Sequence, residues 1–256
     1  MSMIRDYLAG SRWVRRGAVL LALVATALCI RVLLARGYLV TGDSMSGTLL
    51  PGDWVLVNRA AVGPAMYHLG WRLPGYDDLD RFDLIVVRVG RADGPHTMMA
   101  KRVVGLPGDV LSMEGGELRI DGREVEEPYA QPLEENIHRS SRAMDWQLEF
   151  LAAGVDRARY FPTLGNWGPL KLPPGHFFLM GDNRDHSIDS REFGFVTRYD
   201  VVGRVERVLL SHDGSCCDPV SLVEGMRWGR VGLDPGGRAS ADGTEGSPVG
   251  RSLGGA

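Results

Sequence analysis

Short apolar runs separated by glycine, proline and aspartate fill the chain from residue 38 to about residue 210, and this pattern constrains the fold most. Apolar runs of about four to eight residues bounded by turn residues are typical of buried strands. The runs expected to be strands are Trp54–Val57, Leu84–Val89, Thr97–Val104, Phe177–Met180 and Val201–Leu210. Helical periodicity is weak here, and only Met144–Ala153 is expected to form a helix. The pattern predicts a mainly β domain, built on a sheet or a barrel-like sheet.

Other segments predict how these strands are connected. Residues 117–125, ELRIDGREV, predict a tight hairpin, because an Asp-Gly pair separates two alternating runs. Residues 58–80 and 126–174 have little regular pattern, so we expect long connections or an inserted subdomain there. Residues 234–256 contain seven glycines and few large apolar side chains, and we expect this tail to be disordered.

An uncharged run near the N-terminus predicts a membrane anchor. Residues 17–30, GAVLLALVATALCI, carry no charge, and the run continues past Arg31 to Ala35, which gives nineteen residues. A membrane-spanning helix needs about 20 residues. Four arginines precede the run against one acid, so the positive-inside rule places the N-terminus in the cytoplasm. We expect a cytoplasmic segment (1–16), a single anchor in the cytoplasmic membrane (17–36) and an extracytoplasmic domain (37–233).

Two alternatives to the anchor are a cleavable signal peptide and a buried core helix. Ala25-Thr26-Ala27 has the small-x-small form of a cleavage site. Cleavage there would fall inside the apolar run rather than after it, which favours the anchor.

Arginine supplies almost all of the positive charge. Of the 29 Lys and Arg residues, only Lys101 and Lys171 are lysines. A desolvated lysine can accept a proton near neutral pH, whereas arginine cannot. If the protein uses an amine as a base, these two lysines are the candidates.

The remaining composition limits the classes of ligand. The net charge of −3 gives no reason to expect a nucleic acid partner. The three cysteines (29, 216 and 217) are too few for a disulfide scaffold, and the six histidines are scattered. We therefore expect no metal and no cofactor.

Three polar segments interrupt the apolar pattern. Residues 42–49, GDSMSGTL, place Ser44 on a glycine-rich loop directly after the predicted anchor. Residues 100–109, AKRVVGLPGD, place Lys101 in an otherwise apolar strand, either at a solvated edge or buried with a lowered pKa. Residues 181–191, GDNRDHSIDSR, alternate aspartate with arginine, which indicates ion pairs in a rigid loop.

Taken together, these segments resemble the type I signal peptidases, a family of Ser-Lys proteases with a β-sheet catalytic domain. SMSGTL resembles the Ser-Met-x-Pro-Thr-Leu nucleophile box of the family, and GDWVLVNR resembles the adjoining strand. RFDLIVVR and KRVVGLPGD resemble the boxes that carry the lysine. GDNRDHSIDSREFG resembles the Gly-Asp-Asn-x-x-x-Ser-x-Asp-Ser-Arg box. All five occur in the family's order, and the resemblance covers residues 17–210.

The resemblance implies a role for each matching residue. It implies that Ser44 is the nucleophile, that Lys101 is the general base, and that Ser187 orients the lysine amine by a hydrogen bond. The residues implied to form the oxyanion hole and to bind substrate are Gly42, Met45, Met99 and Ala100. The charged residues implied to brace the site are Asp182, Arg184, Asp189 and Arg191. We expect Arg184 and Arg191 to neutralise the aspartates, because an aspartate partner would hold the lysine protonated.

The implied activity is removal of signal peptides from exported preproteins after small-x-small sites. An extended substrate would add to a strand edge and place alternate side chains in shallow pockets. Two positions depart from the family pattern. Gly47 replaces a proline, which predicts a looser nucleophile loop. Gly42 stands where some members have a serine that donates to the oxyanion hole.

Two other functions remain open at this stage. Gly-Asp-Ser-Met is similar to the start of the Gly-Asp-Ser-Leu esterases, in which a histidine three residues after an aspartate is the base. Asp182, however, precedes His186 by four residues. The second alternative is an inactive, membrane-tethered β module that binds peptides.

Overall fold

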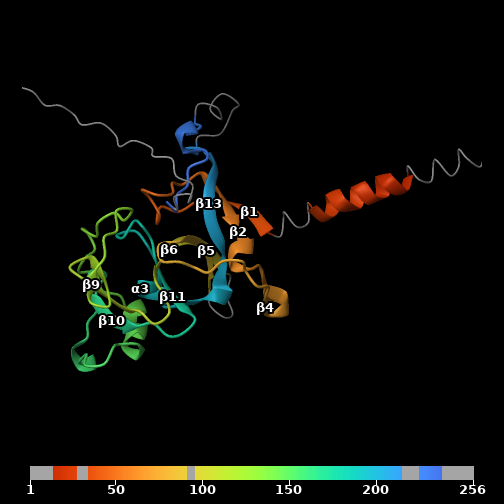
Figure 1. Cartoon of the computed structure of the whole chain (residues 1–256). Coiled ribbons are helices and arrows are strands. Elements are labelled where there is room, and N and C mark those ends of the chain that lie inside the picture. The colour runs from red at the N-terminus through yellow and green to blue at the C-terminus, as the bar shows by residue number, and fades with distance from the viewer. Residues whose placement is uncertain (1–13, 28–33, 91–95, 215–224, 238–256) are drawn as a thin grey trace, which may run out of the picture.

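The computed structural model describes residues 14–27, 34–90, 96–214 and 225–237 (Figure 1). All three cysteines lie outside the described residues, as does most of the tail that the sequence predicts to be disordered.

A seven-stranded antiparallel sheet is the centre of the molecule. Its strands are β1 (Ala35–Leu39), β2 (Asp53–Asn58), β5 (Leu84–Val89), β6 (Thr97–Gly105), β11 (His176–Met180), β12 (Val196–Thr197) and β13 (Val201–Ser211). They pair in the order β1-β2-β13-β5-β6-β11-β12, with β13 between β2 and β5 (Figure 1). The five predicted strands are confirmed to within two residues. The described strands form an open sheet, with β1 and β12 at its edges.

A second sheet forms a small subdomain after β6. Its strands are β7 (Val110–Glu114), β8 (Glu117–Ile120), β9 (Arg123–Glu124) and β10 (Trp167–Lys171), in the order β10-β7-β8-β9. Asp121 and Gly122 have φ values of 51° and 77° between β8 and β9. Positive φ at both central residues is what a type I′ turn requires, so the predicted hairpin is confirmed.

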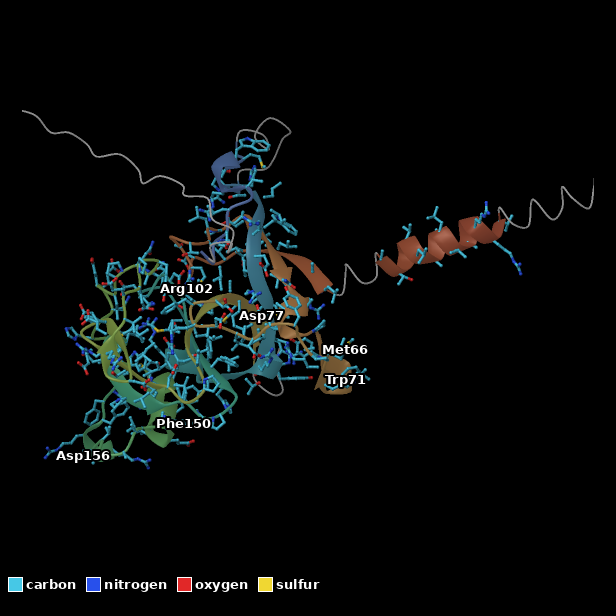
Figure 2. The ribbon with its side chains drawn as sticks, viewed as in Figure 1. Met66, Trp71, Asp77, Arg102, Phe150 and Asp156 are labelled. Atoms are coloured by element: carbon cyan, nitrogen blue, oxygen red, sulfur yellow. The ribbon has the colours of Figure 1, made fainter. Side chains whose placement is uncertain are left out.

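The predicted helix at Met144–Ala153 needs correction. The structure has a 3₁₀ helix, η2 (Arg142–Glu149), and a second short one, η3 (Arg157–Arg159). The helix ends at Glu149 because the next residues bond to β10 instead. Lys171 donates its backbone N–H to Phe150, and Ala152 donates to Pro169. Figure 2 labels Phe150 and Asp156 in this part of the chain.

Short elements occupy the other irregular regions. The helix α2 (Arg59–Val62) and the hairpin of β3 (Ala65–Met66) and β4 (Trp71–Arg72), around the 3₁₀ helix η1 (Tyr67–Leu69), fill the predicted connection 58–80. The remaining elements are α3 (Ser190–Phe193), η4 (Arg198–Asp200) and η5 (Trp228–Arg230).

The N-terminal apolar run is partly helical. Residues 14–27 form a helix whose side chains are all exposed, and β1 begins at Ala35. The last two residues of the predicted anchor therefore belong to the sheet, because Ala35 and Arg36 pair with Asn58 and Val57. Within the described part of the chain, no helix has both the length and the apolar character needed to cross a membrane.

Three buried clusters hold the domain together. The first lies between the small sheet and β11 and includes Leu111, Met144 and Phe178. The second packs the loop after β1, through Met45 and Leu49, onto β2, β5 and β13. The third packs β5, β6, β11 and β13 with α2. Because the second cluster holds the loop that carries Ser44, it positions the site described next.

Candidate active site

Ser44 lies in a tight turn that two buried side chains fix to the sheet. Met45 is 1% exposed and Leu49 is fully buried. The backbone N–H groups of Thr48 and Leu49 both donate to the Met45 carbonyl, at 3.0 and 2.8 Å. Ser44 itself stays half-buried, so its hydroxyl is held in place and remains accessible from one side.

Lys101 contacts the Ser44 hydroxyl directly. It lies on β6 opposite Ile85 of β5, is 2% exposed, and donates from Nζ to Ser44 Oγ at 2.7 Å. Burial lowers the pKa of Lys101, and the nearby charge of Asp189 opposes this shift. The other lysine, Lys171, is exposed and bonds to a backbone carbonyl. Of the two lysines that the sequence offers as an amine base, the buried one, Lys101, contacts Ser44.

Ser187 lies next to the pair but does not make the implied hydrogen bond. It is 3% exposed, and its hydroxyl oxygen makes no hydrogen bond of standard geometry with the described residues. It is close enough to Asp189 to help to lower the pKa of that carboxyl. A Cβ on Gly181 would collide with Ser187 Oγ and with the Ser44 carbonyl oxygen. Glycine at position 181 therefore lets these two segments approach each other.

Asp182 connects the lysine strand to the nucleophile loop. Its fully buried carboxylate accepts from Arg102 Nε and Nη2 at 2.9 and 2.6 Å, and from Thr48 Oγ1 at 2.6 Å. Arg102 follows the candidate base in β6, and Thr48 belongs to the turn after Ser44. The carboxylate thus holds the strand of Lys101 and the turn of Ser44 at a fixed spacing.

Asp189 and Arg191 form a second, fully buried pair. Arg191 donates to both Asp189 oxygens, at 2.8 and 2.9 Å, and also to the Arg184 carbonyl at 2.8 Å. Burial by itself raises the pKa of Asp189, but the Arg191 charge and hydrogen bonds outweigh this effect and lower it. This pair neutralises an aspartate close to Lys101, as predicted.

The partner of Arg184 corrects the sequence-based expectation. Arg184 binds no aspartate side chain and makes a bidentate pair with Glu127, at 2.6 and 2.7 Å, with both side chains buried. The arginine that neutralises Asp182 is Arg102. Sequence reasoning missed Glu127 and Arg102 as site residues. Arg102 stood beside the candidate base and could have been considered, whereas Glu127 lies in a region without a recognisable pattern.

Backbone contacts tie the 181–191 loop to its surroundings. Asn183 N–H donates to the Ser44 carbonyl at 3.1 Å. Asp185 accepts three backbone N–H groups from residues 134–136, which lower its pKa against the opposing effect of burial. These contacts join the loop to Ser44 and to residues 134–136, while its predicted rigidity stays a prediction.

A cavity of about 310 Å³ opens in front of Ser44 and Lys101. The four residues implied to bind substrate or to form the oxyanion hole all line it: Gly42, Met45, Met99 and Ala100. One wall is formed by the end of β1 and the residues after it, and the other by Thr97–Lys101. Because β11 pairs only with residues 102–105 of β6, no described strand pairs with Thr97–Lys101 on that side, and this edge is free within the described part of the chain. The Ser44 N–H makes no hydrogen bond to the described residues and is available to a ligand.

The loop that carries Ser44 has a backbone conformation at Gly47 that does not suit the proline of the family pattern. Gly47 has φ +97°, and the Gln131 side chain packs against it. Proline is locked near −65°, so this loop path excludes the family's proline at position 47. The predicted looseness of the loop stays a prediction.

Two further features bear on other chemistries. His186 also lines the cavity, and its Nδ1 contacts Asn183 Oδ1 at 3.3 Å. Among the described residues, no group of three His, Cys, Asp or Glu side chains is arranged to hold a metal ion.

The family model of the signal peptidases, peptidase S26, matches residues 11–210. Signal peptidase I of Bacillus caldolyticus is 32% identical over 199 residues, which cover 77% of this chain and 88% of that protein. Signal peptidase I of Bacillus licheniformis is 34% identical over 75% of this chain and 83% of its own length. Signal peptidase I S of Bacillus subtilis strain 168 is 32% identical, with coverages of 73% and 82%.

Proposed function

The chain belongs to the signal peptidase family, peptidase S26, and we propose that it removes signal peptides from exported preproteins with Ser44 as nucleophile and Lys101 as general base. The observation that carries this assignment is the 2.7 Å contact between Lys101 Nζ and Ser44 Oγ. A lysine with a lowered pKa has an accessible neutral form, which can take a proton from a hydroxyl at this distance.

The reaction follows the usual steps of a serine protease. The neutral Lys101 amine takes the Ser44 proton as Oγ attacks the scissile carbonyl carbon, and the carbonyl oxygen becomes negatively charged. We propose that the Ser44 N–H, which makes no hydrogen bond to the described residues, donates to this oxyanion. The Lys101 ammonium then protonates the leaving amine, the C–N bond breaks, and an ester to Ser44 remains. Water, deprotonated by Lys101, hydrolyses this ester.

The cavity supports an extended substrate with small side chains. A peptide that pairs with the free edge of Thr97–Lys101 would place alternate side chains toward the cavity, which Met45 and Ala100 help to line. We propose that cleavage follows small-x-small sequences such as Ala-x-Ala. We propose that Ser187 supports the base through Asp189, because Ser187 helps to lower the pKa of that carboxyl and the Asp189 charge acts in turn on Lys101.

We also propose that the N-terminal apolar run anchors the enzyme in the cytoplasmic membrane. Within residues 14–27, the exposed apolar side chains include Leu20, Leu21 and Leu23, at 62–71% exposure. A helix that is apolar on every face is stable in lipid rather than in water. Arginines precede it, so the N-terminus would be cytoplasmic and the peptidase domain extracytoplasmic. Protease added outside intact spheroplasts should then digest the domain; complete protection would contradict this orientation.

Cleavage of a purified preprotein with an Ala-x-Ala site tests the activity. Detergent-solubilised wild type should cut after the final alanine, whereas Ser44→Ala and Lys101→Arg should both be inactive. Lys101→Arg keeps the charge and removes only the base. Cleavage by Lys101→Arg together with loss of cleavage by His186→Ala would favour a histidine base, as in the esterase alternative. A wild type that never cuts would favour the inactive binding module.

A further inference from the structure

Residues 127–131 connect the small subdomain to both catalytic loops. At one end, Gln131 N–H donates to the Asp182 carbonyl at 2.7 Å. The Gln131 side chain packs on Gly47 in the turn that follows Ser44. At the other end, the Glu127 carboxylate binds Arg184. This five-residue segment therefore touches the nucleophile turn and the 181–191 loop at the same time.

The Glu127 carboxylate acts on the serine pair through one arginine. Arg184 is buried, and while its Nη atoms bind Glu127, its Nε donates to the Gly181 carbonyl at 3.0 Å. Gly181 in turn lies against the Ser44 carbonyl and Ser187 Oγ. A change in the Arg184 position would shift the backbone on which these two serines rest.

Tyr129 acts on the lysine strand through a different arginine. Its ring lies 3.9 Å from Arg102 Cζ, and its hydroxyl donates to Glu127 Oε1 at 2.7 Å. Arg102 (labelled in Figure 2) holds Asp182 and is the residue after Lys101. Stacking on an aromatic face restricts the guanidinium plane and so fixes the direction in which it presents its N–H groups.

We propose that Glu127 and Tyr129 are positioning residues for the cleavage reaction. They do not touch the reacting atoms. They fix Arg184 and Arg102, and these arginines set the distance between Lys101 Nζ and Ser44 Oγ. The inference rests on the proposed roles of Ser44 and Lys101. A misplacement of about 1 Å can cost about 100-fold in rate, so the expected effect falls on kcat rather than on substrate binding.

Two pairs of variants separate positioning from simple stabilisation. Glu127→Gln removes the negative charge of the carboxylate that binds Arg184 through two hydrogen bonds. Its control is Asp109→Asn, which does the same to the Arg81–Asp109 pair at 2.9 and 3.2 Å, away from the cavity. Tyr129→Phe removes one phenol hydroxyl, which is hydrogen-bonded to Glu127. Its control is Tyr160→Phe, which removes a hydroxyl bonded to Gln147 and Gly168.

Preprotein cleavage by each full-length variant gives kcat and KM, and guanidinium unfolding gives its stability. We expect Glu127→Gln to lower kcat at least about tenfold with KM within twofold of wild type, and Asp109→Asn to keep kcat at a similar loss of stability. Tyr129→Phe keeps the ring over Arg102, so its kcat should fall less than the kcat of Tyr129→Leu, which removes the ring. Tyr160→Phe should keep kcat.

Three outcomes contradict the proposal. Wild-type kcat in Glu127→Gln and Tyr129→Leu would show that the segment only stabilises the fold. An equal fall in kcat for Asp109→Asn would show a general response to lost stability. If Glu127→Gln does not fold, wild-type kcat in Tyr129→Leu alone overturns the inference. Cleavage by Ser44→Ala, in contrast, would overturn the proposed function itself.

Discussion

Replacement of Lys101 by methionine should change how the stability of the protein depends on pH. Lys101 is 2% exposed, and burial lowers its pKa in the folded state from the ordinary lysine value of 10.5. The unfolded chain keeps the ordinary value. Between the two pKa values, the unfolded state binds one more proton than the folded state. A fall in pH through this window therefore destabilises wild type, while methionine has no proton to bind.

The size of this effect follows from the linkage relation. Each pH unit in the window should cost wild type about 1.4 kcal/mol of unfolding free energy relative to Lys101→Met. Above pH 10.5 the difference between the two proteins is constant, because the lysine is neutral in both states. Below the folded pKa it is constant again, because the lysine is protonated in both. The lower pH at which the difference in unfolding free energy levels off, called the levelling pH below, is therefore the folded pKa of Lys101.

Guanidinium unfolding of both proteins in detergent, at pH values from 6 to 10, measures this difference. The control is Lys171→Met, which removes an exposed lysine that does not line the cavity. If Lys101 is the general base, the levelling pH should match the midpoint of the acidic limb of kcat/KM in wild type. Two results would refute the reasoning. One is a difference in unfolding free energy between wild type and Lys101→Met that does not change with pH. The other is a gap of more than about one pH unit between the levelling pH and the midpoint of the acidic limb of kcat/KM.

Three glycines give further predictions. A Cβ at Gly42 would meet no atom within 4 Å, so Gly42→Ser should fit and add an oxyanion donor that raises kcat about tenfold, whereas Gly42→Ala should not change it. Proline at position 47 cannot adopt φ +97°, so Gly47→Pro should lower both kcat and the melting temperature more than Gly47→Ala does. A fully active Gly47→Pro variant would show that the loop can adopt another backbone conformation. Gly181→Ala should lower kcat by at least about tenfold, because its Cβ collides with Ser187 Oγ and the Ser44 carbonyl; unchanged kinetics would mean that these segments can separate without cost.

Much of the main sheet could be predicted because local sequence determines it. The β-branched run of Leu84–Val89 became β5 with the predicted bounds, and the Asp-Gly pair after Ile120 formed the predicted hairpin turn. A strand needs only a suitable pattern of apolar side chains, and this turn needs only two residues that tolerate positive φ. Both requirements can be read over a few residues. The predicted helix failed at its end because distant β10 residues compete for its backbone groups.

The candidate catalytic pair was also accessible from the sequence. Lysine is rare in this chain, and the apolar strand around Lys101 left a solvated edge and burial as the two alternatives, of which the structure shows burial. The resemblance to the signal peptidases then implied Ser44 as its partner. What the sequence could not give was the 2.7 Å contact itself, which depends on how β6 and the loop after β1 pack against the same core.

The pairing of the buried charges was decided only by the tertiary structure. The 181–191 loop offers three aspartates and two arginines, and all of their pairings are chemically similar. Arg184 pairs with Glu127, 57 residues away, and Asp182 pairs with Arg102, 80 residues away. A buried charge must have a partner, but its identity depends on which segments the fold brings together. The sequence alone predicted ion pairs in this loop, and the tertiary structure, which brings β6 and Glu127 against it, decided which charged side chains meet.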